Sequence, residues 1–271
     1  MKTIAIMSPK GGIGKTTTAD AIAYILGEEK KKKVLVLDGD PQGDTSKIFG
    51  AYEPEGAGMS ELLEHHRLTG GNYTTWSLIQ QTEYSTIDII PANGYLMKTD
   101  MELMMRQESN QITRLRDALK EVQGLYDYCV CDCGRLLDMV VLNILMAADV
   151  VIAPIKVGGY ENDAIYTLQE QLDELEDGMG KRLGVIGLMT MRQKNKTTLE
   201  FEEWMRTMSG FLMFDTPVRR SIVVEKASMA RLPLPKFSRN GITTKDYRAV
   251  VEELLQNYED MEGSEREWER S

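Results

Sequence analysis

The chain has 271 residues, of which 42% are hydrophobic and 27% are charged, and its formal net charge is −10. This length suits one large domain or two small ones and buries a sizeable core. No run of 18 apolar residues occurs, which excludes a membrane span, and the N-terminus enters a strand-like run without a cleavage site, so we expect no signal peptide.

The three cysteines, Cys129, Cys131 and Cys133, occupy alternate positions. Neighbours this close do not bridge easily, and an odd count favours a reducing cytoplasm. A metal site is the sharper alternative, but zinc ligands that are paired in sequence normally have two or more residues between them. We therefore expect a cytoplasmic protein with free thiols.

The positive charges gather in one part of the chain. The segment from Lys181 to Arg248 holds fourteen Lys and Arg against six Asp and Glu, a local charge of +8 that leaves −18 on the remaining residues. A basic stretch in an acidic chain is compatible with nucleic-acid binding, because the distribution of charge matters more than its total. Ordinary scatter of surface charges is the alternative.

Short apolar runs alternate with longer amphipathic stretches. The predicted strands are Thr3–Met7, Val34–Leu37, Ile87–Ile90, Tyr128–Cys131, Val150–Pro154 and Leu183–Met189, and helical patterns include Thr17–Leu26, Ser109–Val122 and Asp163–Leu175. Several strands are apolar on both faces, as parallel strands covered by helices are. The order predicts an α/β fold: a doubly wound, mostly parallel sheet with helices on both faces and ligands at the carboxyl ends of its strands.

The end of the chain predicts one long domain and a tail. The chain has neither an internal repeat nor a Pro/Ser-rich linker, so we expect a single domain over residues 1–258. Its last helix has apolar side chains at helical spacing, namely Tyr247, Val250, Val251, Leu254, Leu255 and Tyr258. Residues 259–271 hold six acids and two arginines and are expected to form a solvated acidic tail.

The first predicted strand leads into a glycine-rich loop. The loop reads Ser8-Pro9-Lys10-Gly11-Gly12-Ile13-Gly14-Lys15-Thr16-Thr17, and Pro9 stands where the usual phosphate-loop pattern has its first glycine. The three glycines let backbone N–H groups turn inward, and the following helix N-terminus adds partial positive charge. Lys15 can reach the β- and γ-phosphates, and the Thr16 hydroxyl can ligate Mg²⁺. The loop therefore predicts a P-loop NTPase.

The form Lys-Gly-Gly-x-Gly-Lys-Thr resembles the deviant Walker A motif of the ParA/MinD family. This resemblance implies ATP and Mg²⁺ as ligands, with Lys10, Gly11, Gly12, Ile13, Gly14, Lys15, Thr16 and Thr17 at the nucleotide. It also implies a homodimer that sandwiches ATP, in which Lys10 crosses the interface to the partner's phosphates. Lys10 and Lys15 are thereby catalytic candidates.

Two acids follow the second predicted strand. Asp38 and Asp40, in Asp38-Gly39-Asp40-Pro41-Gln42-Gly43, are spaced i, i+2 and are expected to point the same way. One can hold the water of the metal and the other can orient the attacking water. The segment resembles Asp-x-Asp-Pro-Gln-Gly of the family, which implies that Asp40 positions the water and that Asp38 lies in the outer shell of Mg²⁺.

A third acid, Asp132, follows the fourth predicted strand. An acid at this place in a P-loop protein is a candidate to accept hydrogen bonds from Mg²⁺-bound water. The family commonly has Asp-Cys-Pro-Pro here, whereas this chain has Asp132-Cys133-Gly134-Arg135. The change loosens the loop and adds a cation. Arg135 either contacts phosphate or a partner, or is only solvated.

The resemblance extends over residues 1–255 and becomes looser toward the C-terminus. It includes Ile87–Asn93, Ala147–Pro154 and the region from Asp215 to Ser228, where the family contacts adenine and where Pro217 is the nucleotide candidate. No helix-turn-helix domain precedes the loop, as in short ParA forms. These forms bind DNA nonspecifically through C-terminal basic residues, and our DNA-binding candidates are Arg192, Lys194, Arg219 and Arg220.

The resemblance implies DNA partition with a ParB-like centromere-binding adaptor, and hence a nucleoid-associated protein that does not act at a membrane. A MinD-like positioning ATPase is the first alternative, although such chains end in a basic amphipathic helix and this chain ends in acids. The second is a metabolic P-loop enzyme or an iron–sulfur ATPase, although the chain lacks the Cys-x-x-Cys motif of cluster carriers.

Overall fold

The computed structural model describes residues 1–64, 73–106, 108, 110–156, 170, 173–175, 177, 183–208 and 212–268. Within them, eight strands form one sheet in the order β3-β4-β2-β5-β1-β6-β7-β8. All neighbouring strands pair in parallel except β3 and β4, which pair antiparallel. The strands are β1 (Lys2–Ile6), β2 (Val34–Gly39), β3 (Gln80–Gln81), β4 (Ile87–Ile90), β5 (Tyr128–Cys133), β6 (Val150–Lys156), β7 (Val185–Thr190) and β8 (Leu212–Met213).

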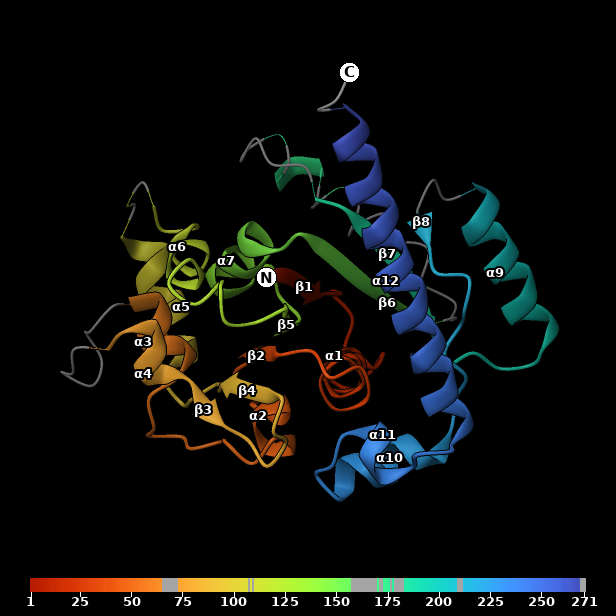
Figure 1. Ribbon diagram of the computed structural model, residues 1–271, viewed down its shortest axis with the longest axis horizontal. Coiled ribbons are helices and arrows are strands. Elements are labelled where there is room, and N and C mark those ends of the chain that lie inside the picture. The colour runs from red at the N-terminus through yellow and green to blue at the C-terminus, as the bar shows by residue number, and fades with distance from the viewer. Residues whose placement is uncertain are drawn as a thin grey trace.

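Helices connect the strands and cover the sheet (Figure 1). The first helix, α1 (Lys15–Tyr24), continues into a π-helical turn, η1 (Ile25–Glu29). The others described are α2 (Asp44–Ile48), α3 (Met59–Glu64), α4 (Thr75–Leu78), α5 (Leu96–Met105), α6 (Arg114–Leu119), α7 (Met139–Ala147), α9 (Lys196–Met208), α10 (Ile222–Met229), α11 (Leu234–Phe237) and α12 (Ile242–Trp268).

The alternation of side chains along each strand produces two cores, one on each face of the sheet. On one face, Ala5, Leu35 and Cys131 pack against α3, α5, α6 and α7. On the other face, Ile4 and Val36 pack against α1 and α12. Helices on both faces of a mostly parallel sheet confirm the doubly wound α/β fold.

The six predicted strands are present with small shifts at their ends, and two short edge strands, β3 and β8, were not predicted. The predicted helix Ser109–Val122 was too long, since α6 covers only Arg114–Leu119. The predicted helix Asp163–Leu175 lies mainly outside the described residues. All three cysteines are buried on β5 in the first core, with 3.8 Å between the sulfurs of Cys129 and Cys131.

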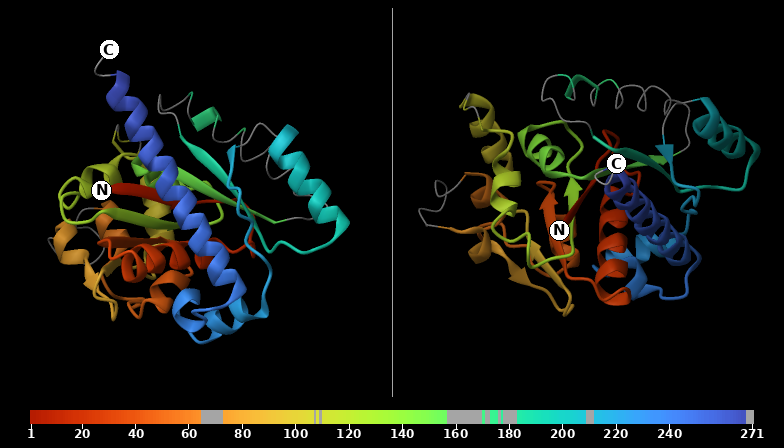
Figure 2. Two further views of the ribbon diagram at one scale, coloured as in Figure 1. Left: turned by 45° about the vertical axis from the view of Figure 1, so that its right-hand side comes forward. Right: turned by 45° about the horizontal axis from the view of Figure 1, so that its top comes forward.

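The last helix, α12, passes beside α1, and the C-terminal end of α12 extends beyond the sheet (Figure 2). Tyr247, Val250, Val251 and Leu254 are buried, as their spacing predicted. The side chain of Tyr258 lies outside the described residues. Because α12 runs through residue 258 as far as Trp268, the division into a domain of residues 1–258 and a tail stays a prediction.

Candidate nucleotide-binding site

Three strands bring the predicted site residues together. Strands β2, β5 and β1 are neighbours, and the register pairs Asp38 of β2 with Asp132 of β5 and Asp132 with Ile6 of β1. Because these strands are parallel, the loops that follow them meet at one edge of the sheet. The glycine-rich loop and two of the three predicted acids therefore lie side by side.

The glycine-rich loop joins β1 to α1. Gly12 and Gly14 have φ values of +69° and +93°, a left-handed conformation that glycine adopts at little cost. Gly14 precedes the first turn of α1 and provides no side-chain cap for it. The N–H groups at this helix end are thus suited to bind an anion.

Two contacts hold the loop in shape. Lys15 is buried, and its Nζ donates a hydrogen bond of 3.0 Å to the carbonyl oxygen of Lys10. The residue Lys10 is half-buried. On the other side, Thr190 at the end of β7 donates a hydrogen bond of 2.8 Å to the carbonyl oxygen of Ile13. Burial lowers the pKa of Lys15, while the charges of Asp132 and Asp40 raise it. The lysine thus lies inside the loop, close to two acids.

Asp132, at the end of β5, contacts the first turn of α1. Its Oδ2 accepts hydrogen bonds from the Thr16 hydroxyl at 2.7 Å and from the Thr45 hydroxyl at 2.9 Å. Its Oδ1 is buried and has no partner among the described residues. Burial, followed by the charge of Asp38, raises the pKa of Asp132 to about 8. A buried carboxylate oxygen without a partner is costly, and a hydroxyl beside carboxylates fits the oxygen ligands that Mg²⁺ prefers.

Asp38 and Asp40 have different surroundings. Asp38 is fully buried, and its Oδ2 accepts hydrogen bonds from the backbone N–H and the hydroxyl of Ser46 at 2.8 and 2.6 Å. Burial raises the pKa of Asp38 to about 6, against the lowering effect of the Ser46 hydrogen bonds. Asp40 is half-buried, and its Oδ1 accepts from the N–H of Gln42 at 2.9 Å. Asp38 thus fixes the following loop, whereas Asp40 is the more accessible acid.

A fourth acid, Asp20, was not singled out in the sequence. It lies on α1, is fully buried, and its Oδ1 lies 3.0 Å from the hydroxyl oxygen of Thr45. Burial and the charge of Asp132 raise its pKa well above the usual value. In the sequence, the one local indication that Asp20 belongs to the site was its place one helical turn after Thr16. Thr45 joins it to Asp132, which lies 87 residues farther along the chain than Thr45.

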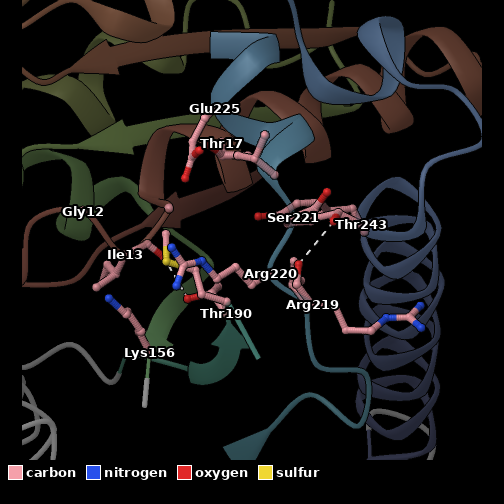
Figure 3. A pocket seen from close by; sticks show the side chains of 15 residues that line it. Gly12, Ile13, Thr17, Lys156, Thr190, Arg219, Arg220, Ser221, Glu225 and Thr243 are labelled. Carbon is pink, nitrogen blue, oxygen red and sulfur yellow. Dashed lines mark hydrogen bonds between the residues drawn. The ribbon is translucent and has the colours of Figure 1, made fainter. Parts of the chain in front are cut away.

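A cavity of about 250 Å³ opens beside the glycine-rich loop, on the side of β6 and β7 (Figure 3). The loop contributes Gly12, Ile13 and Gly14 to its lining, and α1 contributes Thr17. The other walls come from the ends of β6 and β7, the segment 218–221 and the start of α12. Pro217, the predicted nucleotide contact, precedes this segment but does not line the cavity. The cavity is large enough for part of a nucleotide that extends from the loop.

Two of the four DNA-binding candidates are engaged in ion pairs. The guanidinium of Arg219 points away from the cavity toward α12 (Figure 3), where its Nε donates to Asp246 at 2.9 Å. Arg192 donates to Glu202 at 3.1 Å. Lys194 and Arg220 are exposed and form no ion pair with a described residue, and Arg220 points into the cavity.

No helix in the described part of the chain has the length and hydrophobicity to cross a membrane. The same residues contain no group of three or more His, Cys, Asp or Glu that is arranged to hold a metal.

Comparisons with known proteins identify the family of the chain. The sequence profile of a family described as an AAA domain matches residues 1–185. The chromosome partitioning protein ParA of Myxococcus xanthus is 28% identical over 255 residues, 93% of this chain and 87% of that protein. A putative plasmid partition protein from Borrelia burgdorferi, solved with AMPPNP, is 23% identical, with a TM-score of 0.77 over 94% of this chain and 99% of the other.

The cobyrinic acid a,c-diamide synthase of Mycobacterium smegmatis, solved with an ATP analogue and magnesium, shares the fold. It is 22% identical, with a TM-score of 0.78 over 96% of each chain. Fold likeness at this identity does not select between partition and metabolic chemistry. The profile match covers more than half of the chain, so the chain belongs to the AAA-domain family and is a ParA-type member of it.

Proposed function

We propose that the chain is a Mg²⁺-dependent ATPase that dimerises with ATP, binds DNA nonspecifically and partitions DNA together with an adaptor protein. The observation that carries the proposal is the pair of Thr16 and Asp132, which lies beside the buried Lys15 and leaves Asp132 Oδ1 without a partner among the described residues. A cation, a hydroxyl and a carboxylate at the start of a helix are the groups that a Mg-nucleoside triphosphate requires.

ATP would lie with its phosphates on residues 10–17 and its nucleoside toward the cavity lined by Thr190 and Val218. Thr16 and Asp132 would hold Mg²⁺, with Asp132 acting through a bound water and Asp38 farther out. When bound, the ion neutralises charge on the phosphates. The Borrelia protein with AMPPNP and the Mycobacterium synthase with an ATP analogue and magnesium support this choice of ligands.

Asp40 is our candidate for positioning the attacking water. It is half-buried, whereas Asp38 is fully buried and accepts two hydrogen bonds from Ser46. A carboxylate that orients water must be reachable by that water. This difference in exposure favours Asp40 over Asp38.

The DNA contact of the proposal rests on a basic segment, residues 226–245. It carries Lys226, Arg231, Lys236, Arg239 and Lys245 and no acid. All five are exposed, and none forms an ion pair with a described residue, although Lys236 lies 5.9 Å from the ring centre of Tyr84. Unpaired surface cations are available to phosphates at little cost, whereas Arg192 and Arg219 would first have to leave their carboxylates.

The dimer of the proposal rests on the resemblance of the loop and on Lys10. Lys10→Ala should spare ATP binding and lose the dimer that forms with ATP. Sedimentation velocity with ATP, with ADP and without nucleotide tests this directly. An ATP-dependent dimer that forms equally well in Lys10→Ala would remove the role of Lys10 across the interface.

Two measurements test the activity and its place of action. ATP turnover should require Mg²⁺, disappear with EDTA, and rise on addition of duplex DNA and the adaptor. Co-sedimentation with DNA or with anionic vesicles separates partition from action at a membrane. The vesicle arm is needed because two apolar side chains, Ile222 beside the basic segment and Met229 within it, are exposed. Binding to DNA supports the proposal, whereas binding to vesicles alone favours a MinD-like regulator.

A further inference from the structure

Arg135 follows β5 and lies against the glycine-rich loop. A Cβ atom placed at Gly11 would be 3.2 Å from both Cδ and Nη1 of Arg135, so the arginine side chain lies directly on the loop backbone there. Arg135 is nevertheless exposed, as is Gly11. The contact therefore lies at the open side of the loop and not in the core.

The guanidinium of Arg135 has no acid as a partner in the described part of the chain. It forms neither a hydrogen bond nor an ion pair there, although the chain has ten more acids than bases. Lys15 faces the same loop, since its Nζ donates to the carbonyl oxygen of Lys10, next to Gly11. Two cations that face the same loop repel each other until an anion lies between them.

The position of Arg135 relative to the cavity indicates which part of a nucleotide it faces. The cavity lies on the β6 and β7 side of β1, and it includes Thr190 and Val218. Arg135 follows β5, which pairs with the opposite edge of β1. A nucleotide with its nucleoside in the cavity and its phosphates along the loop would extend toward β5. Its last phosphate would then lie on the side of Asp132 and Arg135.

We propose that Arg135 binds the terminal phosphate of ATP bound to its own subunit. This inference rests on the proposed ATP site and adds to it a cation that belongs to the same chain. A planar guanidinium suits this contact because it donates two parallel hydrogen bonds to phosphate oxygens. ADP lacks the phosphate in question, so Arg135 distinguishes ATP from ADP and its loop responds to hydrolysis.

The test compares the affinities of ATP and ADP for four proteins. Arg135→Ala and Arg135→Lys are measured against the wild type by calorimetric titration with a non-hydrolysable ATP analogue and with ADP, both with Mg²⁺. Arg116→Ala is the matched control, because Arg116 is exposed beside Met1 and Thr3 at the amino end of β1. Thermal melting without nucleotide checks that each variant is folded.

Arg135→Ala should bind the ATP analogue at least tenfold more weakly and ADP less than threefold more weakly, with Arg135→Lys between the wild type and Arg135→Ala. Arg116→Ala should match the wild type for both nucleotides. Equal losses for the two nucleotides, or no loss for either, would overturn the inference. Failure of the wild type to bind either nucleotide would instead overturn the proposed ATP site itself.

Discussion

At the scale of single residues, the candidate site concentrates carboxyl groups in the protein interior. Asp38 and Asp132 are paired in register on neighbouring strands and are both buried. Their raised pKa values express the cost of burying these charges close together. A divalent cation would offset this cost, so the apo protein carries a destabilising feature that its ligand removes.

The two buried carboxyl groups of Asp38 and Asp132 make the stability of the apo protein depend on pH. The pKa values in the folded state, about 6 for Asp38 and about 8 for Asp132, lie above the usual 3.8. Between pH 4 and pH 8 the folded protein therefore holds protons that the unfolded chain has released, and stability falls as pH rises. Asp132→Asn should flatten this fall between pH 6 and pH 8. Calorimetric melting without Mg²⁺ tests it, and parallel curves for the two proteins would contradict it.

Lys15→Ala should lose ATP binding. Removing the charged partner of a buried contact costs about 2–5 kcal/mol, which corresponds to roughly 30-fold or more in affinity. Lys120→Ala is the matched control, because Lys120 is exposed, pairs with Asp117 and lies near Met1 at the amino end of β1. Titration with an ATP analogue measures both variants. If Lys15→Ala binds as tightly as the wild type, the loop does not hold the phosphates as proposed.

Asp40→Ala and Asp40→Asn together separate two roles of Asp40. Asn keeps an oxygen that accepts from the N–H of Gln42, but it cannot take up a proton or carry the charge. If Asp40 positions the attacking water, both variants should bind ATP and hydrolyse it about 10²–10⁴-fold more slowly in single turnover. Wild-type hydrolysis by Asp40→Asn would restrict the role of Asp40 to holding the turn.

At the scale of elements, the pair of Arg219 and Asp246 fastens the segment after β8 to α12. Both Nε and Nη2 of Arg219 donate to the carboxylate, and Asp246 also accepts from the backbone N–H of Arg219. Arg219→Ala should lower the free energy of unfolding by about 1–3 kcal/mol, because it removes the charged partner of the buried Asp246 and leaves it only the backbone N–H. Urea unfolding measures the change, and an unchanged midpoint would show that the pair does not stabilise the fold.

The sequence predicted the central strands well because they are buried on both faces, which leaves continuous apolar runs such as Val34–Leu37. It did not predict β3 and β8, since strands of two residues at the edges of a sheet have no detectable pattern. Ile112 and Val122 continue the apolar spacing of α6 into the flanking turns, which is why the predicted helix was too long.

The same division holds for the candidate site. Lys15, Thr16 and Asp132 could be named as candidates because their motifs are local in sequence. Thr45, Ser46 and Asp20 could not, because their roles depend on contacts between distant segments, such as the hydrogen bond from Thr45 to Asp132. Likewise, the positive charge of Arg219 was visible in the sequence, but its pairing with Asp246 was not.

At the scale of the whole molecule, we propose that the nucleotide site controls binding through the polarised charge. The basic segment 226–245 includes α11 and the second half of α10, and these helices lie together near the beginning of α12 (Figure 1). A dimer formed with ATP would carry two such segments and would therefore hold a polyanion more tightly than one subunit does. The acidic remainder of the chain would repel DNA elsewhere and so orient the dimer on it.

One measurement tests this claim most directly: the fluorescence anisotropy of a labelled duplex, titrated with protein at two salt concentrations, with ATP and then with ADP. We expect ATP-dependent binding to duplexes of unrelated sequence. In Lys226→Ala with Arg231→Ala, the salt slope should become shallower by roughly 0.9 for each DNA phosphate that the variant no longer neutralises. The equally charged control, Arg116→Ala with Lys120→Ala, should bind as the wild type does. Absence of binding by the wild type with ATP at low salt would contradict the account.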